Sequence, residues 1–352
     1  MVAGSVATDA WLRPVEAVSR PLADAAVLSA LADRWGIAAE LKRLPTECDQ
    51  VFLVAEVSGR RRVLRIVSGA KAEAELLLQN AALGAVRRHA PQLPVPVVIP
   101  SLAGRAVEQL DAAGVHHSAT LYTYLVGEPV GRTVGSRAQR EELGATLAHL
   151  DCALANLDWP SESDPFPWNV LRVGELRPLL VDERDAGRRR LAEAAIDDFM
   201  QGAQGALHAM PRQFIHNDFN AKNVLVDLAR PEVVTGIIDF GDLLRAPRIV
   251  DLGVAIARQI GVDRPVEDGA DIVGAYHRVS PLGEEEIGLL HHIVCARLAI
   301  RLTVWSWRAR RGRAGDDPAV PAQAAVLLDT FRRFGEAAAT ARFRTATGHA
   351  GC

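Results

Sequence analysis

The stretch Phe214-Ile-His-Asn-Asp-Phe-Asn-Ala-Lys-Asn-Val-Leu-Val226, followed by Gly236-Ile-Ile-Asp-Phe-Gly-Asp242, decides what fold is expected of this chain. It contains the spacing His216-x-Asp218-x-x-x-x-Asn223, and Asp239 opens an Asp-Phe-Gly triplet 16 residues later. An Asp that accepts a hydroxyl proton, with an Asn and a second Asp that hold magnesium, forms the acceptor half of a phosphoryl-transfer site. The spacing predicts Asp218 as the catalytic residue, Asn223 and Asp239 as Mg²⁺ ligands, and His216 as a brace for the catalytic loop.

The residues between these positions are typical of a β-hairpin. Apolar runs follow Asn223 and precede Asp239, and the turn signal Ala229-Arg-Pro-Glu232 lies between them. Antiparallel pairing centred on Pro231 would bring Asn223 and Asp239 side by side. Two oxygen ligands would then meet at one end of the hairpin, as a cation that bridges nucleotide phosphates requires.

The composition is that of an ordinary globular protein. The chain has 352 residues, 49% of them hydrophobic, and a formal net charge of −3. No basic excess points to nucleic acid or to a membrane surface as a partner. The four cysteines are scattered without metal-site or disulfide spacing, which fits a reducing cytoplasm. The N-terminus lacks a signal-peptide pattern, and the most apolar segment, Ile287–Trp307, is interrupted by His291, His292, Arg297 and Arg301.

The patterning along the chain predicts an α+β, bilobal arrangement with a β-rich N-lobe and a mainly helical C-lobe. Residues 1–18 have no periodicity and are expected to form a loose arm. Residues 1–125 are predicted to form the N-terminal, nucleotide-binding lobe, and residues 126–352 the C-terminal, catalytic and acceptor-binding lobe. In the first lobe the strands are expected at 51–57, 62–67, 94–96, 105–110 and 119–125, and the helices at 19–36 and 70–89.

Helices are expected to dominate the second lobe. Ser136-x-x-Gln139 is a capping-box signature that opens a helix to about Leu157, and a second helix is expected at 191–209. Three or four further helices are predicted between residues 248 and 345.

The chain resembles the aminoglycoside phosphotransferase and choline kinase group, which has the protein-kinase fold. Leu121-Tyr-Thr-Tyr-Leu-Val-Gly-Glu-Pro129, Pro167-Trp-Asn-Val-Leu171 and the segment from His216 to Asn223 are most similar to hydroxylysine kinase and related phosphotransferases. The resemblance implies an N-terminal lobe over ATP or GTP, a hinge near 123–126 and an acceptor pocket in the helical lobe. It assigns nucleotide contacts to Gln50, in the loop 46–50 that covers the phosphates, and to the hinge residues Tyr124 and Val126.

The chain departs from this family at the strand that pairs the phosphates. Arg65 stands where the kinase fold usually has lysine, and the nearest lysine, Lys71, follows a Ser-Gly turn. Arginine keeps the charge and grips phosphate oxygens with two parallel hydrogen bonds. Its expected partner is an acid on the next helix, Glu75 or, as the alternative, Glu73. The glycine-poor loop 46–50 is a second departure.

The length of the segment after the Asp-Phe-Gly triplet indicates a small acceptor. Only Asp242-Leu-Leu-Arg245 separates Gly241 from Ala246-Pro-Arg248, which is too short for an activation loop that binds a polypeptide. Asp251, on the following helix, is expected to brace the catalytic loop.

Four further residues are candidates for acceptor binding. Asp242 would favour an amine. Arg297 and Arg301 lie four apart on one face of a predicted helix, and with Trp305 nearby they would hold a carboxylate or stack on a ring. The alternative for these residues is a solvated arginine face with tryptophans in the core.

Three functions remain open from the sequence. The first is a nucleoside-triphosphate-dependent kinase that phosphorylates a hydroxyl of a small amine-containing molecule, such as a hydroxylysine-like amino acid. The second is an antibiotic O-phosphotransferase that confers resistance or self-protection. The third is a nucleotide-binding pseudokinase with a regulatory role, which Arg65 and the glycine-poor loop keep open. The sequence does not indicate the oligomeric state.

Overall fold

The computed structural model describes residues 21–46, 49–69, 72–112, 115–160, 167–311 and 317–349. The expected N-terminal arm, Lys71 and part of the loop 46–50 lie outside these ranges. The chain forms two compact units. The first comprises Met1–Val126, Leu157–Trp159 and Gly236–Gly241, and the second comprises Gly127–Asn156, Pro160–Thr235 and Asp242–Cys352.

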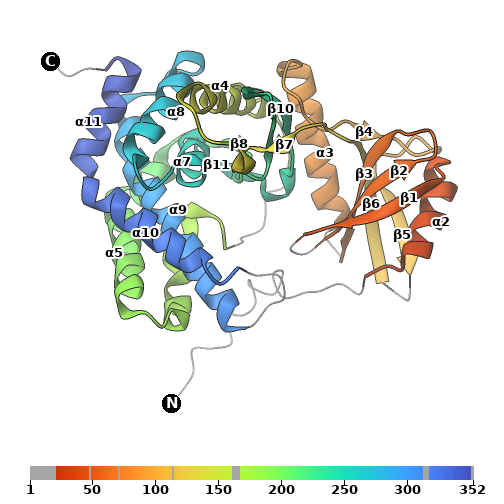
Figure 1. Ribbon diagram of the computed structural model, residues 1–352, viewed down its shortest axis with the longest axis horizontal. Helices are drawn as coiled ribbons and strands as arrows, with labels where there is room; N and C mark the ends of the chain where they lie inside the picture. Colours follow the sequence, from red (N-terminus) through yellow and green to blue (C-terminus); the bar gives the residue numbers. More distant parts are fainter. Residues whose placement is uncertain are drawn as a thin grey trace. The chain divides into compact units, whose positions relative to one another are not determined.

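The first unit is built on one antiparallel sheet with the strand order β1-β2-β3-β6-β4, and β5 also pairs with β6 (Figure 1). Its elements are α2 (Asp24–Trp35), β1 (Ala39–Leu44), β2 (Gln50–Glu56), β3 (Arg61–Ser68), α3 (Ala72–His89), β4 (Val98–Ile99), β5 (Glu108–Ala112) and β6 (Val115–Thr123). The strand expected at 94–96 forms instead at β4.

Side-chain alternation along β3 positions its one central arginine. Successive residues of a strand point to opposite faces of the sheet. Leu64 and Ile66 are fully buried in a cluster with Val27 and Leu31 of α2. Arg65, between them, therefore points to the other face, where it reaches helix α3.

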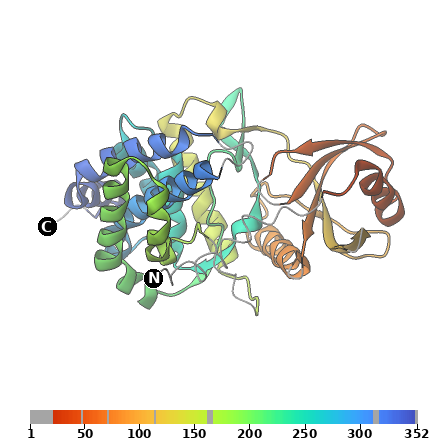
Figure 2. The same cartoon turned by 90° about the horizontal axis from the view of Figure 1, so that it is seen from below.

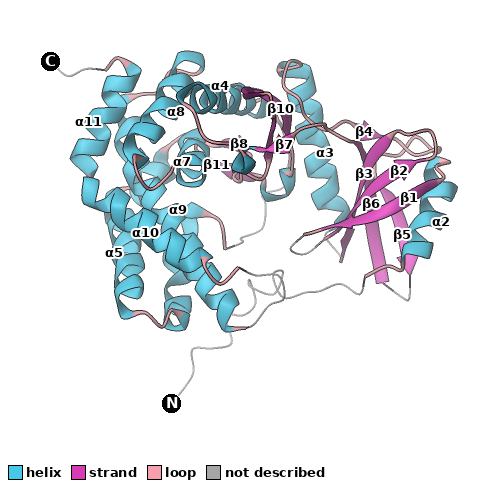
Figure 3. Ribbon diagram, in the orientation of Figure 1, coloured by secondary structure: helices cyan, strands magenta, loops and turns pink. Residues whose placement is uncertain are grey.

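The second unit is mainly helical, as the cyan ribbons of Figure 3 show. Its elements are β7 (Glu128–Pro129), the 3₁₀ segment η1 (Val130–Arg132), α4 (Arg137–Leu154), the 3₁₀ segment η2 (Val170–Asp182), α5 (Ala186–Gly202), α6 (Gln204–Ala209), β8 (Gln213–Ile215), β9 (Val224–Asp227), β10 (Arg230–Ile237), η3 (Phe240–Asp242), β11 (Leu244–Ala246), α7 (Arg248–Gln259), α8 (Pro265–Val279), α9 (Glu284–Arg310), α10 (Val320–Phe334) and α11 (Glu336–Thr347). β10 and η3 run across the boundaries between the two units.

Helix α9 is the core helix of the second unit. It packs against α5, α7, α10 and η2, and the helices coloured green to blue surround it in Figures 1 and 2. Among the described residues it is the one helix long and apolar enough to cross a membrane, but 83% of that window is buried inside the protein. Its apolar character is accounted for by this packing.

Local signals place several elements of the second unit correctly. The Ser136 hydroxyl accepts a hydrogen bond from the Gln139 backbone N–H at 3.1 Å, so α4 begins where the capping signal indicates. The Gln139 side chain does not complete a capping box, because it donates to the Thr133 hydroxyl and the Pro231 carbonyl.

The prediction of three or four helices between 248 and 345 is wrong, since five helices, α7 to α11, lie in this part of the chain.

The predicted centre of the β9–β10 hairpin is also wrong. Strand β9 ends at Asp227 and β10 begins at Arg230, so the turn lies at Leu228 and Ala229, and Pro231 is inside the second strand. The Asp227 carboxylate accepts the Ala229 backbone N–H at 2.8 Å, which fixes a tight turn at this point. The hairpin is therefore not centred on Pro231, and the register expected from that centre is wrong.

Candidate active site

The loop between β8 and β9 carries Asp218 and is hydrogen-bonded to helix α7. Asp251, fully buried in the first turn of α7, accepts the backbone N–H groups of His216 at 2.7 Å and Asn217 at 2.9 Å. The His216 ring nitrogen Nδ1 in turn accepts the Asp218 backbone N–H at 3.3 Å. Asp251 and His216 thus connect helix α7 to the backbone of Asp218.

The backbone of this loop is constrained at Asn217. Its φ of 62° lies in the left-handed region, where residues with a side chain are uncommon. Such a conformation persists only where the surroundings impose it. Full burial of Asn217 and its bond to Asp251 supply that constraint.

A second buried carboxyl group supports Asp251. Burial raises the pKa of Asp151 well above its usual range, and the neighbouring charge of Asp251 raises it further. Burial raises the pKa of Asp251 as well, but His216 and the backbone N–H groups favour its ionised form. The stronger upward shift of the Asp151 pKa favours the protonated form of this carboxyl group. The Tyr276 hydroxyl donates to Asp151 Oδ2 at 2.7 Å.

The Asp218 carboxylate lies between an amide and a guanidinium. Its Oδ2 accepts the Asn223 Nδ2–H at 2.8 Å, and its Oδ1 accepts from Arg297 Nη2 at 3.3 Å. The side chain remains 21% exposed, so a small hydroxyl has access to it. Because the Asn223 nitrogen makes this bond, its oxygen Oδ1 is the atom left to coordinate a cation.

Arg297 contacts Trp168 as well as Asp218. It is almost completely buried on α9, its Nη1 donates to the Trp168 carbonyl at 2.6 Å, and its guanidinium lies 5.3 Å from the Trp168 ring centroid. Burial lowers the pKa of Arg297, and the charge of Asp218 opposes that effect. A buried guanidinium of this kind requires an anionic partner, which Asp218 supplies.

In the first unit, Arg65 collects three partners on the α3 face of the sheet. Its Nε donates to Asp49 Oδ2 at 2.7 Å, and its Nη1 donates to Gln79 Oε1 at 3.1 Å and to Asp239 Oδ1 at 3.3 Å. Burial lowers the pKa of Arg65, but the carboxylates of Asp49 and Asp239 outweigh it, so the net shift is upward. Arg65 is therefore a fixed, permanently charged group beside Asp239.

Gly241 makes this approach of Arg65 and Asp239 possible. A Cβ at this position would lie 2.8 Å from Arg65 Nη2 and 3.1 Å from Asp239 Oδ1. Asp239 itself has a left-handed φ of 63° and a side chain that is 52% exposed. The glycine of the Asp-Phe-Gly triplet thus has a steric role, and the acid is open to solvent.

Two of the expected nucleotide contacts stay predictions, and the structure shows other contacts at these positions. Arg65 contacts Gln79 of α3, one turn beyond Glu75, and Gln79 lies on the buried side of the helix while Glu75 and Glu73 are exposed. The pairing of Arg65 with either acid stays a prediction. The Gln50 side chain makes a contact within the first unit. It is 7% exposed, and its oxygen accepts the Leu22 backbone N–H at 2.7 Å, so it fixes the segment that enters α2.

The remaining expected residues lie in the following places. Tyr124 follows β6, and the Arg61 guanidinium covers its ring at 4.2 Å from the centroid; Val126, the last residue of this segment of the first unit, is 68% exposed. Asp242 is half-buried and contributes to the field at Arg297. Trp305 is covered by Arg308 at 4.4 Å, which engages its ring within α9.

The oxygen donors suit a magnesium ion that a nucleotide helps to hold. Among the described residues no group of three or more His, Cys, Asp or Glu side chains forms a metal cage. Mg²⁺ is usually bound by one or two protein oxygens together with substrate phosphates. Asn223 Oδ1 in the second unit and the exposed Asp239 carboxylate in the first are such donors, and their convergence on one ion stays a prediction.

Four residues that these contacts bring forward were not predicted from the sequence, namely Asp49, Asp151, Gln79 and Trp168. Asp49 and Trp168 lie inside motifs that had been singled out, so their positions were an available signal. Asp151 and Gln79 lie within helical patterns, and only the packing of one element on another identifies them.

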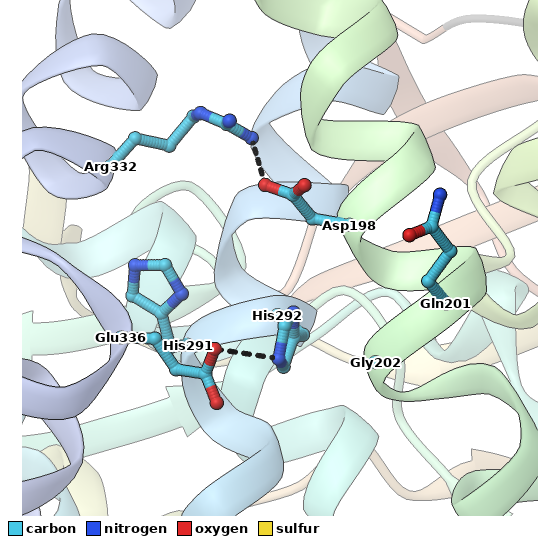
Figure 4. Close-up of a pocket in the computed structure, with 7 residues that line it drawn as sticks. All are labelled: Asp198, Gln201, Gly202, His291, His292, Arg332 and Glu336. Atoms are coloured by element: carbon cyan, nitrogen blue, oxygen red, sulfur yellow. Dashed lines mark ion pairs between the residues drawn. The ribbon is translucent and has the colours of Figure 1, made fainter.

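A separate polar cavity of about 430 Å³ lies within the second unit, among α5, α9, α10 and α11 (Figure 4). Ion pairs cross it from Arg332 to Asp198 at 2.7 Å and from His292 to Glu336 at 3.3 Å. Burial lowers the pKa of His291 to about 4, which keeps that ring neutral. None of the residues expected to bind nucleotide, metal or acceptor lines this cavity.

Known proteins that are similar to this chain are phosphotransferases. A sequence model described as the phosphotransferase enzyme family matches residues 14–290. Hydroxylysine kinase of Danio rerio is 26% identical over 284 residues, which cover 77% of this chain and 79% of that protein. Hydroxylysine kinase of Mus musculus is 28% identical over 195 residues, 52% of each chain, so the match spans about half of that relative.

Solved structures with similar folds are small-molecule kinases. An amicoumacin kinase in complex with AMP-PNP and Ca²⁺ has a TM-score of 0.67 and 14% identity, with 88% of this chain and 94% of that chain covered. A microcompartment-associated aminopropanol kinase has a TM-score of 0.61 and 17% identity, with 92% and 99% covered. At these identities the likeness shows the fold alone, and it confirms the expected α+β, protein-kinase-like fold.

Proposed function

The chain belongs to the phosphotransferase enzyme family and is a small-molecule phosphotransferase. We propose that it transfers the γ-phosphate of ATP or GTP to a hydroxyl of a small amine-containing molecule resembling hydroxylysine. The observation that carries this proposal is the Asp218 carboxylate, partly exposed, oriented by Asn223 and Arg297 and fixed through its backbone to α7. The similarity to hydroxylysine kinases supports the choice of acceptor.

In the proposed reaction Asp218 orients the acceptor hydroxyl and receives its proton. The hydroxyl oxygen forms a bond to the γ-phosphorus as the bond from that phosphorus to the β–γ bridging oxygen breaks, and the nucleoside diphosphate leaves. Both Asp218 oxygens already accept one hydrogen bond, but each keeps a second lone pair for the incoming hydroxyl. Arg297 keeps the carboxylate in place while the proton moves.

Residues of both units are proposed to hold the nucleotide. Asn223 and Asp239 would bind Mg²⁺, which supplies charge neutralisation for the phosphates when bound. Arg65 would pair with phosphate oxygens, and its fork toward Asp49 keeps the guanidinium from turning away. The backbone near Tyr124 and Val126 would form the hinge against the base.

The short segment after Gly241 supports a small acceptor. Its residues form β11, which pairs antiparallel with β8 from Leu244–Ile215 to Ala246–Gln213, and α7 begins at Arg248. A strand with these pairings cannot act as a polypeptide-binding activation loop. Asp242, beside this strand, is the proposed contact for the acceptor amine.

The test is phosphate transfer from γ-labelled ATP and GTP to a panel of hydroxylated amino acids, amino alcohols and antibiotics, with Mg²⁺ present. The proposal expects the highest kcat/KM among hydroxylysine-like amino acids. Preference for an antibiotic would replace it with the O-phosphotransferase function. Nucleotide binding without transfer to any panel member would support the pseudokinase function instead.

A further inference from the structure

Two arginines close to Arg297 lack the acidic partner that Arg297 has. Arg301 follows it by one turn of α9, and Arg258 lies near the end of α7, which packs on α9. Among the described residues, neither Arg258 nor Arg301 makes an ion pair or hydrogen bond through its guanidinium, and the Nε atom of each is buried without a hydrogen-bond partner. Buried donors are normally satisfied, so a missing ligand group is the natural partner.

The electrostatics of the cluster point to an anion. Burial and repulsion from Arg258 and Arg297 together lower the pKa of Arg301 to about 10. Arg258 also opposes the charge of Arg297. Three guanidinium groups therefore repel one another in a partly desolvated place, and Asp317 is the acid that acts on Arg301. A carboxylate would relieve this repulsion and satisfy the free N–H groups.

Arg297 cannot serve as that carboxylate's main partner, since its Nη1 and Nη2 donate to the Trp168 carbonyl and to Asp218. It contacts the catalytic acid and precedes Arg301 by one turn of α9. Four residues along a helix correspond to about 6 Å of rise. This separation suits an amino acid whose hydroxyl is several bonds from its carboxylate.

We propose that Arg258 and Arg301 form a subsite for the α-carboxylate of the acceptor, with the acceptor hydroxyl directed to Asp218. The proposal rests on the proposed function and narrows the acceptor to hydroxylated amino acids, in preference to amino alcohols. In this proposal Arg258 and Arg301 bind the carboxylate together, and Arg297 positions Asp218.

The kinetic test compares hydroxylysine with its decarboxylated analogue in wild type, R258Q and R301Q. Loss of a charge-assisted hydrogen bond predicts a kcat/KM for hydroxylysine that is about 10- to 100-fold lower in each variant. The kcat/KM for the decarboxylated analogue is expected to stay within about twofold of wild type. R264Q is the matched control, because Arg264 is exposed just after α7 and its change should affect neither acceptor.

Equal losses on both acceptors, or no loss on hydroxylysine in either variant, would overturn the subsite. A wild-type enzyme that prefers the decarboxylated analogue would overturn it while leaving the proposed function intact. If wild type phosphorylates no acceptor, the function has failed, and calorimetric titration with hydroxylysine then decides the subsite. Binding that R258Q weakens about tenfold or more and R264Q does not supports it, and absence of binding ends it.

Discussion

Replacement of Arg65 with lysine tests whether the guanidinium is a true substitute for the lysine expected at this position. Arg65 reaches Asp49, Gln79 and Asp239 at once, at distances between 2.7 and 3.3 Å from its Nε and Nη1. A lysine ammonium is a single point charge on a flexible stem and cannot hold this fork. We expect R65K to keep its attraction to Asp49 or Asp239 and to lose the bond to Gln79 and one bond to a carboxylate.

The expected magnitude follows from these contacts. A hydrogen bond to a charged group contributes about 1.5–3 kcal/mol, and the Arg65 side chain is only 19% exposed, so little of the loss is recovered from water. R65K should therefore lower the free energy of unfolding by about 2 kcal/mol in a urea titration. Its affinity for ATP or GTP should fall about tenfold, because the charge remains but the paired hydrogen bonds do not. R65M, without the charge, should bind nucleotide more weakly than R65K.

R60K is the matched control, since Arg60 is exposed in the turn before the same strand. Its unfolding free energy and nucleotide affinity should match wild type. An R65K protein that is as stable as wild type and binds nucleotide as tightly would show that the paired hydrogen bonds of Arg65 contribute to neither property. Equal affinities in R65K and R65M would refute a role for the charge.

Two further predictions concern residues that the structure brings forward. G241A should raise the KM for nucleotide about tenfold by pushing Arg65 away from Asp239, while G205A, where a Cβ meets no atom within 4 Å, should leave steady-state kinetics unchanged; an equal KM in the two variants would remove the steric role of Gly241. For Asp151, the folded chain keeps a proton that the unfolded chain releases above about pH 4, so wild type should lose stability relative to D151N as pH rises, by up to about 1.4 kcal/mol per pH unit. Urea titrations of both proteins from pH 4 to 8 measure this difference, and a difference that is flat across the range would show that Asp151 is ionised in the fold.

Much of the fold was predictable because strong local signals agree with the packing. The alternation of Leu64, Arg65 and Ile66 predicts a strand, and burial of the two apolar neighbours against α2 follows from it. Ser136 opens α4 as its capping signal indicates. The spacing of Asp218 and Asn223 corresponds to a direct hydrogen bond of 2.8 Å between their side chains.

What the sequence did not reveal depends on contacts between distant elements or on weak turn signals. Proline dominates the apparent turn at Pro231, but the Asp227 carboxylate fixes the chain reversal earlier. Gln79 contacts Arg65 from the buried side of α3, and an expectation based on charge alone did not single it out. Arg297 was expected to bind acceptor, and its commitment to Asp218 becomes visible only when α9 is packed beside the catalytic loop.

The most direct measurement of the central claim is the turnover of D218N with Mg²⁺, nucleotide and the best acceptor of the panel. Asparagine retains the shape of Asp218 but cannot take the hydroxyl proton, so kcat should fall by a factor of about 10²–10⁴ while thermal stability and nucleotide affinity stay close to wild type. A D218N enzyme that is folded, binds nucleotide and turns over at nearly the wild-type rate would contradict the assignment of Asp218 as the group that activates the acceptor.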